Sequence, residues 1–292
     1  MDIRLKKLGS SRTEALVTVP EDSVHTAETE VLRGLSRRVE IKGFRPGMAP
    51  LERVREAVPH DRLREEVVEK LVPGVLRELV ATHKLQPIIR PRVELQSFLP
   101  MILKCTLVEK PEVMVDVKKV QAEVKQKREE RGAGGQGKNG EKKDEPEDAR
   151  AEDERIALEA VAAHTKVDLA PELMEEEIGG VVERHARRLA QFGLTLEGSL
   201  QKEGKTIEKV VEEVRPDAEK RLRIRFGVTA LIRDFKIEVS EEEMRLAIEA
   251  LLQPLPEAER LKLRSLYEPG GRAYGQFRFQ RLAEKVLERL TM

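Results

Sequence analysis

The sequence is poor in cysteine, in aromatic rings and in long apolar runs, and each shortage argues against a class of protein. Its 292 residues include one cysteine, Cys105, no Trp, seven Phe and two Tyr. One cysteine excludes a disulfide framework and is expected to be a buried, inert thiol in a reducing compartment. No segment approaches the roughly 18 apolar residues of a membrane span, and the start lacks the apolar stretch of a secretory signal. We therefore expect a cytoplasmic protein without membrane contact.

Signatures of catalysis, metal binding and cofactor binding are missing as well. Residues 132–138, "GAGGQGK", match the G-x-x-x-x-G-K part of the phosphate-binding loop pattern. However, Asn139 stands where that pattern has the Ser or Thr that holds magnesium, and no apolar strand precedes the segment. The five histidines lack metal-ligand spacing, and the carboxylates alternate with Lys and Arg as they do on solvated helix faces. We expect no enzyme, no metal and no cofactor.

The chain is instead rich in charge and in aliphatic residues, a combination typical of helical proteins. Charged residues make up 37% of it and hydrophobic residues 39%, and the formal net charge is zero. When Lys and Arg are counted against Asp and Glu, the charge is +4 over residues 1–110, zero over 111–150 and −4 over 151–292. The basic excess lies in the first third, which is where we expect contact with a polyanion.

Apolar periodicity predicts a small α+β domain over residues 1–116. Alternation at Ala15, Val17 and Val19 indicates a half-buried strand, and apolar spacings of three and four residues indicate helices. We expect a strand at 14–20, helices at 22–42, 51–58 and 62–83, the last capped by Asp61 and kinked at Pro73–Gly74, and strands at 91–97 and 99–110. The final strand is long enough to pair with the first.

The rest of the chain is predicted to be a linking segment followed by a helical domain. Residues 117–150 contain a charged helix at 117–131 and a stretch rich in Gly and charge at 132–148, which has too few apolar residues to fold and is expected to be flexible. Over 151–292 we expect helices at 151–165, 171–192, 206–235, 241–252 and 272–290. The fourth of these opens with a capping box formed by Ser240 and Glu243.

One loop is unusual because it places an apolar ring between two glycines, with charged helical sequence on either side. In "RRVEIKGFRPGMAPLERV", Arg37–Val54, the glycines allow a tight turn that lifts Phe44 and Arg45 clear of the core. An exposed ring is suited to burial against a partner, and a guanidinium can bind a phosphate or carboxylate through two hydrogen bonds. The alternative is a ring folded back onto its own domain.

The octet "GFRPGMAP", Gly43 to Pro50, resembles the ribosome-docking signature Gly-Phe-Arg-x-Gly-x-x-Pro of the trigger factor family of bacterial chaperones. Similar surroundings, including "KLGSSRTEALVTVPEDSV" and "VEKPEV", extend over roughly the first 118 residues, and "AHTKVDLAPELMEEEI" carries a looser likeness beyond residue 150. The resemblance implies an α+β ribosome-binding domain followed by a mostly α-helical chaperone domain. It also implies docking at the ribosomal tunnel exit, on proteins and rRNA, through Gly43, Phe44, Arg45, Pro46 and Gly47.

The same resemblance implies a chaperone that works without ATP and shields nascent or unfolded polypeptides, and the sequence leaves open whether the chain is a homodimer when free of the ribosome. Seven of the nine aromatic residues lie beyond residue 190, and core packing is the alternative role for each of them. Phe277 and Phe279 are two positions apart, so on a helix they cannot both face one narrow stripe. The predicted substrate contacts are Met174, Phe192, Phe226, Met244, Tyr274, Phe277 and Phe279.

Two departures from the family pattern bear on function. Most members have Lys where this chain has Pro46, and often a basic residue where it has Met48, so we expect weaker phosphate contacts and a flatter salt dependence of binding. Most family members also contain a prolyl-isomerase domain, which lies between the docking domain and the helical body. Here the Gly-rich interval falls below the roughly 50 residues that a domain needs, so we expect no peptidyl-prolyl isomerase activity.

Two further functions remain open from the sequence. The first is a ribosome-bound structural or regulatory factor whose helical domain contacts one folded partner. The second is a free holdase whose altered loop tip no longer binds ribosomes.

Overall fold

The computed structural model describes residues 1–134 and 146–291, which form two compact units. The first unit contains Met1–Glu112 and Asp168–Leu173, and the second contains Val113–Val167 and the chain from Met174 onward. Each unit has a core of its own, so each is described separately. The predicted linker at 132–148 lies largely outside the described residues, as does most of the "GAGGQGK" segment.

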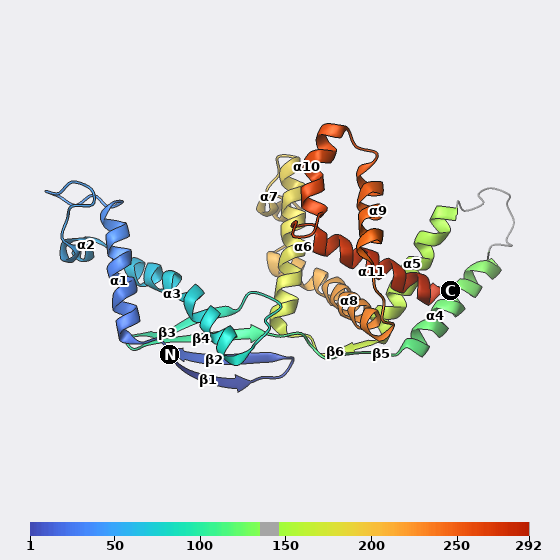
Figure 1. Cartoon of the computed structure of the whole chain (residues 1–292), viewed down its shortest axis with the longest axis horizontal. Helices are drawn as coiled ribbons and strands as arrows, with labels where there is room; N and C mark the ends of the chain where they lie inside the picture. Colours follow the sequence, from blue (N-terminus) through green and yellow to red (C-terminus); the bar gives the residue numbers. More distant parts are fainter. Residues whose placement is uncertain (135–145, 292) are drawn as a thin grey trace. The chain divides into compact units, whose positions relative to one another are not determined.

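The first unit is an antiparallel sheet with helices on one face (Figure 1). Its strands are β1 (Asp2–Lys7), β2 (Arg12–Thr18), β3 (Arg92–Phe98) and β4 (Met101–Val108), in the order β1-β2-β4-β3. Its helices are α1 (Glu21–Ser36), α2 (Leu51–Ala57) and α3 (His60–His83). The predicted α+β fold is confirmed, including the pairing of the first predicted strand with the last.

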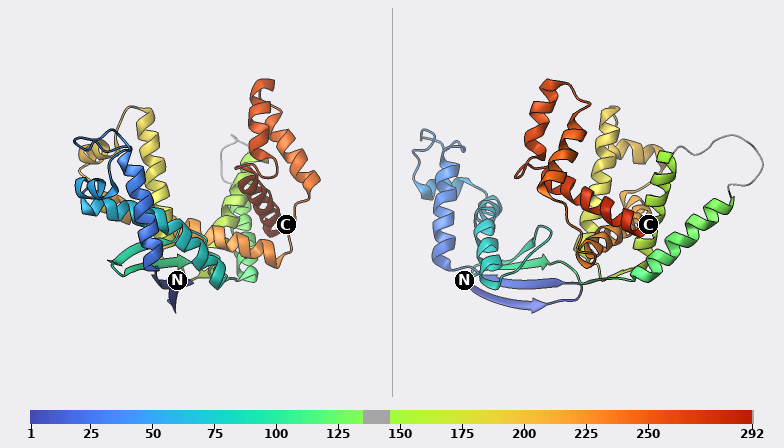
Figure 2. Two further views of the ribbon diagram at one scale, coloured as in Figure 1. Left: turned by 60° about the vertical axis from the view of Figure 1, so that its left-hand side comes forward. Right: turned by 45° about the vertical axis from the view of Figure 1, so that its right-hand side comes forward.

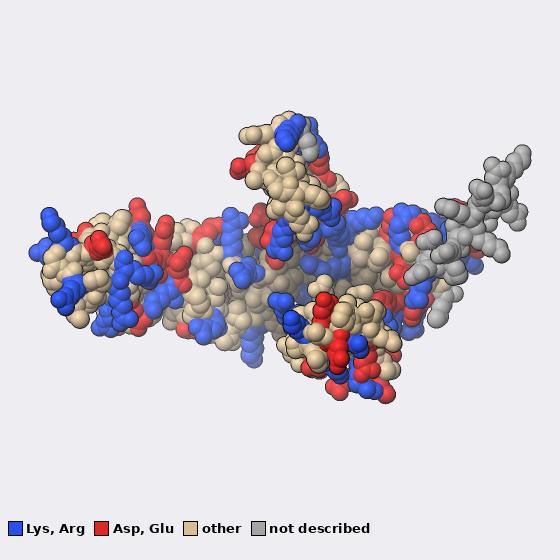
Figure 3. Space-filling model, turned by 90° about the horizontal axis from the view of Figure 1, so that it is seen from above, with Lys and Arg blue, Asp and Glu red and all other residues tan. Residues whose placement is uncertain are grey.

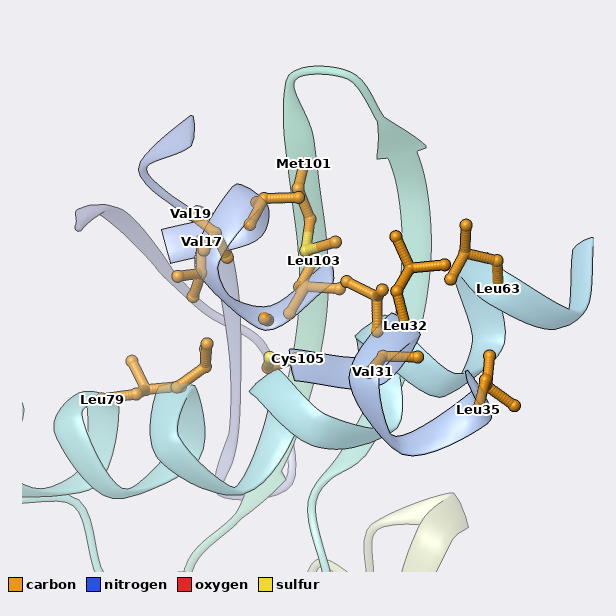
Figure 4. Packing of buried hydrophobic residues seen from close by; sticks show 14 of the residues in the cluster. Val17, Val19, Val31, Leu32, Leu35, Leu63, Leu79, Met101, Leu103 and Cys105 are labelled. Atoms are coloured by element: carbon orange, nitrogen blue, oxygen red, sulfur yellow. The ribbon is translucent and has the colours of Figure 1, made fainter. Parts of the chain in front are cut away.

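The core of this unit follows from period-two burial on the strands and a single apolar stripe on each long helix. Alternate residues of β4 point to the same side of the sheet, and Met101, Leu103 and Cys105 are fully buried. Figure 4 shows these side chains close to those of Leu32 on α1 and Leu79 on α3. Burial raises the pKa of the Cys105 thiol to about 11, because a buried thiolate would lack solvation, and the thiol is therefore inert as predicted.

Three local features of the first unit differ from the sequence predictions. Strand β1 was not predicted, because only Ile3 and Leu5 interrupt its polar residues, as is common for an edge strand. Helix α1 ends at Ser36 instead of continuing towards the glycines. Helix α3 runs unbroken past Pro73, where a kink was predicted. Its N-cap is Pro59, so Asp61 lies in the first turn of the helix and does not cap it.

The second unit is almost entirely helical. Its helices are α4 (Val117–Gly134), α5 (Pro146–His164), α6 (Pro171–Gln191, whose first residues belong to the first unit), α7 (Leu196–Glu203), α8 (Ile207–Asp234), α9 (Glu241–Leu252), α10 (Glu257–Tyr267) and α11 (Tyr274–Thr291). Two short strands, β5 (Val113–Val115) and β6 (Thr165–Val167), pair as an antiparallel ribbon. All the predicted helices are present and the Ser240–Glu243 capping box is formed, whereas α7, α10 and the ribbon were not predicted.

The core of the second unit is built where α4, α5, α8 and α11 meet. Val120, Val124, Val161, Leu231 and Val286 are buried there. A smaller apolar cluster lies between α9, α10 and the start of α11. Helices α9 and α10 lie side by side as a hairpin, drawn in orange-red in Figure 2.

Helix α8 comes unusually close to β6 at one glycine. A methyl group placed on Gly227 would lie 2.4 Å from Thr165 Oγ1 and 2.7 Å from Val161 Cγ1. Thr165 is buried, and its hydroxyl donates a hydrogen bond to the carbonyl of Val161 at 2.6 Å. This contact requires a residue without a side chain on α8.

Candidate functional site: the loop between α1 and α2

The candidate site is the loop of residues 37–50, which joins α1 to α2 and lies beyond the end of α1, away from the sheet (Figure 1). Three backbone hydrogen bonds hold its central part, residues 41–48. The amide of Gly47 donates to Ser36 O at 2.8 Å, that of Phe44 to Ile41 O at 3.0 Å, and that of Met48 to Arg45 O at 3.0 Å. The loop is therefore a folded hairpin-like turn whose base is fastened to the last residue of α1.

The two glycines of the octet adopt backbone angles that other residues rarely reach. Gly43 has φ +90° and Gly47 has φ +82°. At Gly47 an added Cβ would also approach Arg37 Cγ at 3.4 Å. The spacing of glycines in the octet thus has a conformational reason, because both turns need positive φ.

Apolar residues on both sides of the tip anchor the loop to the core. Val39, Ile41, Ala49 and Leu51 are partly buried and pack against the core of the first unit. Between them, every residue from 42 to 48 is exposed. The tip therefore projects into solvent between flanking residues that are packed on the core, and it does not fold back onto the domain.

The tip carries two apolar side chains that face solvent. Phe44 is 45% exposed and Met48 is 75% exposed. The other phenylalanine of this unit, Phe98, is instead partly buried with the Arg64 guanidinium over its ring at 5.5 Å. The alternative in which Phe44 packs into its own domain is not the one observed.

The charges around the tip are mainly positive and mostly unpaired. Over residues 1–134 and 146–291, no ion pair or side-chain hydrogen bond involves Arg37, Lys42 or Arg45. Arg38 is the exception, with Nη2 3.9 Å from Glu66 Oε2. At the end where the loop lies, Figure 3 shows Lys and Arg side chains and some Asp and Glu side chains, with uncharged atoms between them.

The residues predicted to contact substrate divide into three groups. Met174, Phe226 and Met244 are 8%, 6% and 2% exposed, so they are core residues and cannot meet a client on the folded surface. Tyr274 and Phe277 are half-buried in the cluster of α9, α10 and α11, where Phe277 makes an edge-on contact with Tyr267. Phe192 and Phe279 are exposed, at 76% and 37%. The expectation that Phe277 and Phe279 face different ways is confirmed.

Other exposed apolar residues of the helical unit were missed in the sequence. Leu246, Leu251 and Leu261, on α9 and α10, are exposed by 54%, 43% and 69%. Leu246 and Leu261 line a groove between the two helices, together with the buried Leu252. Nothing in the sequence distinguishes them from core leucines, because leucine at helical spacing usually faces inward.

No grouping of His, Cys, Asp and Glu suited to a metal ion occurs among the described residues. None of the helices described is both long and apolar enough to cross a lipid bilayer.

Comparison with known families identifies the two parts of the chain. Residues 1–131 match the family described as bacterial trigger factor protein, and residues 137–290 match the trigger factor C-terminus. The chain belongs to the trigger factor family. Only residues 132–136 separate the two family matches, so no isomerase domain is inserted between them.

The curated relatives resemble the chain mainly in its first part. Trigger factor of Desulforudis audaxviator is 33% identical over 118 residues, which cover 39% of this chain and 27% of that protein. Trigger factor of Bacillus cytotoxicus is 35% identical over 96 residues, covering 33% and 22%, and that of Bdellovibrio bacteriovorus is 34% identical over 94 residues, covering 32% and 21%. The chain thus aligns with only about a quarter of the length of these trigger factors.

A solved structure supports the fold over the whole chain. It comes from work on promiscuous substrate recognition in folding and assembly by the trigger factor chaperone. It superposes with a TM-score of 0.64 and covers 100% of this chain and 99% of its own, at 15% sequence identity. The trigger factor architecture, with an α+β domain and a helical body, is therefore shared in full.

Proposed function

We propose that the chain is an ATP-independent chaperone of the bacterial cytoplasm that docks at the ribosomal tunnel exit and shields nascent or unfolded polypeptides. The observation that carries the docking part is the exposed Phe44 next to Arg45, which has no ionic partner in the described part of the chain, on a loop whose backbone is hydrogen-bonded in place. Membership of the trigger factor family supports the chaperone part.

The energetics of the loop favour docking onto a larger partner. Covering an apolar ring releases about 1.5–3 kcal/mol, and a rigid loop loses little conformational entropy when it binds. The guanidinium of Arg45 can make two hydrogen bonds to one carboxylate or phosphate at the same time. Phe44 and Arg45 together can therefore supply both affinity and orientation.

The helical unit has the surface expected of a protein that binds unfolded chains weakly at many points. Among the described residues, its exposed large apolar side chains lie on several helices, loops and a short strand, and they are Met114, Phe192, Leu194, Ile207, Leu246, Leu251, Leu261 and Phe279. Charged residues surround them along the same helices, which keeps the surface hydrated. Scattered weak contacts allow release without nucleotide hydrolysis, and they favour a chaperone over a factor with one folded partner.

The docking proposal can be tested by co-sedimentation with bacterial 70S ribosomes. We expect the double variant Phe44→Ala/Arg45→Ala to lose at least tenfold in affinity, because each 1.4 kcal/mol is a factor of ten. The matched control is Phe192→Ala/Arg188→Ala, which removes an exposed ring and an exposed guanidinium from the helical unit and should bind within about twofold of the parent chain. Unchanged binding by the loop variant would exclude ribosome docking through this loop and favour a free holdase.

The chaperone proposal needs a separate assay. The chain should suppress aggregation of several unrelated proteins diluted from denaturant, and a variant with Phe192, Leu246 and Leu261 changed to Ser should do so less well. Saturable one-to-one binding of a single folded protein, without suppression of aggregation, would contradict it and favour a dedicated ribosome-bound factor.

A further inference from the structure

The first unit contains a polar pocket where β1 turns into β2, beside the C-terminal end of α3 and the chain that follows β4 (Figure 1). Its volume is about 390 Å³, which is within the roughly 300–1,000 Å³ of small-ligand sites. None of the residues that line it belongs to the loop of residues 37–50. The pocket is therefore a separate feature of the domain.

Hydrogen bonds between the surrounding segments hold the walls of the pocket in place. The amide of Leu8 donates to Arg12 O at 2.8 Å, which closes the turn between β1 and β2. The amide of Glu109 donates to Ser11 O at 3.0 Å, and its side-chain Oε1 accepts from the amide of Gln86 at 2.9 Å. The turn, the chain after α3 and the chain after β4 are thus tied together, so a ligand would meet a preformed pocket.

Cations outnumber carboxylates on the wall of the pocket. The cations are Lys7, Arg12, Lys84 and Lys110, and the carboxylates are Glu109 and Glu112. Arg12 is already paired, with Nη1 3.4 Å from Glu172 Oε1. The three lysines are exposed, and within residues 1–134 and 146–291 none of them has an ion pair or a side-chain hydrogen bond. Three ammonium groups around one pocket attract an anion.

A buried hydroxyl group also lines the pocket. Thr13 is only 4% exposed, and the strand register places it opposite Lys7. Among the residues that the structure describes, its hydroxyl has no hydrogen-bond partner. A buried hydroxyl without a partner destabilises a fold, whereas a bound oxyanion would accept its hydrogen bond.

The backbone around the pocket adopts conformations that are rare outside glycine. Ser11 and Lys84, which line it, have φ +55° and +53°, and the neighbouring Ser10 has φ +58°. In the rest of the described chain, Lys236 alone among non-glycine residues has a positive φ. Such conformations are costly and gather at ligand-binding positions, which agrees with a binding role for this turn.

We propose that this pocket binds an anion with two or three linked phosphate groups. Lys7, Lys84 and Lys110 neutralise the phosphates, and the Thr13 hydroxyl donates to one of their oxygens. A single carboxylate carries one negative charge and would leave most of the lysine charge uncompensated, so linked phosphates fit better. This function is additional to ribosome docking and does not depend on it.

The first experiment measures binding of inorganic tripolyphosphate by isothermal titration calorimetry at low salt. We expect one molecule to bind per chain with a Kd below about 1 mM, and Lys7→Gln/Lys84→Gln to weaken binding at least about tenfold. The matched control is Lys6→Gln/Lys118→Gln, which removes two exposed, unpaired lysines outside the pocket and should bind within about twofold of the parent chain. No binding, or equal weakening in both variants, would overturn the inference.

The second experiment tests the hydroxyl group, which a general attraction between charges would not require. Thr13→Val keeps the shape of the side chain but should weaken binding at least about fivefold, whereas Thr13→Ser should stay within about twofold. Tripolyphosphate should also raise the melting temperature of the parent chain and of Thr13→Ser more than that of Thr13→Val. An unchanged affinity in Thr13→Val would contradict the inference. The lysine variants remain a valid test if Thr13→Val is unstable, because Lys7 and Lys84 are exposed.

The third experiment separates linked phosphates from the backbone of RNA. Tripolyphosphate should bind at least about tenfold more tightly than orthophosphate or an eight-nucleotide oligouridylate, because both of these place fewer charges in one pocket. If the oligouridylate binds more tightly than tripolyphosphate and Lys7→Gln/Lys84→Gln weakens it, the pocket contacts RNA and the assignment is wrong. Co-sedimentation of Lys7→Gln/Lys84→Gln with 70S ribosomes should match the parent chain, so that loss of docking and loss of phosphate binding are seen separately.

Discussion

Replacing Gly227 by Ala should destabilise the helical unit, although the same change in most helices is stabilising. In an unhindered helix interior, Gly→Ala is favourable by about 1 kcal/mol. At Gly227 the new methyl carbon would lie 2.4 Å from Thr165 Oγ1, at least 1 Å inside the distance of an ordinary contact. Overpacking of this kind costs about 1–3 kcal/mol, and the upper value applies because Thr165 and Val161 are both buried.

The net effect is a destabilisation of about 2 kcal/mol, which for a unit of this size lowers the melting temperature by about 4–8 °C. Circular dichroism at 222 nm or calorimetry would measure the shift. The matched control is Gly179→Ala on α6, where an added methyl meets nothing within 4 Å, so this variant should be slightly more stable than the parent chain. Ribosome binding at low temperature should be unchanged, because Gly227 lies in the unit without the loop.

A double-mutant cycle tests the cause of the destabilisation. Thr165→Ala alone should cost about 1 kcal/mol, since its hydroxyl donates to Val161 O. In that background Gly227→Ala should cost less, because the closest clashing atom is gone and only Val161 Cγ1, at 2.7 Å, still lies inside contact distance. If Gly227→Ala stabilises the protein as Gly179→Ala does, or if its cost does not change without the Thr165 hydroxyl, the close contact between α8 and β6 is wrong.

Three further predictions concern acid stability, thiol chemistry and catalysis. The hydrogen bond from Lys285, together with that from the Ser240 amide, lowers the pKa of Glu243 from 4.5 to about 2. The stability that the Glu243 carboxylate contributes is therefore present above pH 4.5 and is lost as the pH falls towards 2. Acid titration of unfolding should therefore be flatter over this range for Glu243→Gln, and an identical profile would contradict the ion pair. Cys105 should react with thiol reagents only after unfolding, because burial raises its pKa to about 11; rapid labelling of the native protein would show that its strand opens. In a proline-peptide assay the chain should give the uncatalysed rate, and catalysis above background would mean that isomerase chemistry resides outside the expected inserted domain.

The elements that could be predicted from the sequence are those whose side chains repeat with a clear period. The alternation in β2 and the apolar stripes on α1 and α3 were visible because each element buries one face. Strand β1, the β5–β6 ribbon and helices α7 and α10 were missed. They are short or lie at an edge, and α10 has no buried residue at all, so their apolar pattern is weak.

The candidate loop could be recognised from the sequence, and its role in docking stays a prediction. Its glycines, ring and guanidinium are consecutive, so the chemistry of the tip needs no long-range contact to be recognised. The exposure of the predicted substrate contacts could not be read from the sequence. Phe192 and Phe226 are the same residue type in the same helical region, yet one is 76% exposed and the other 6%.

The sequence by itself determined the family, the α+β and helical classes of the two parts, and the octet of the loop between α1 and α2, because these depend on local pattern and adjacent residues. Only the tertiary structure decided that Phe44 and Met48 face solvent, that Met174, Phe226 and Met244 do not, and that Gly227 must lack a side chain. The physical reason is that burial depends on which other elements pack against a residue, and those elements come from distant parts of the chain.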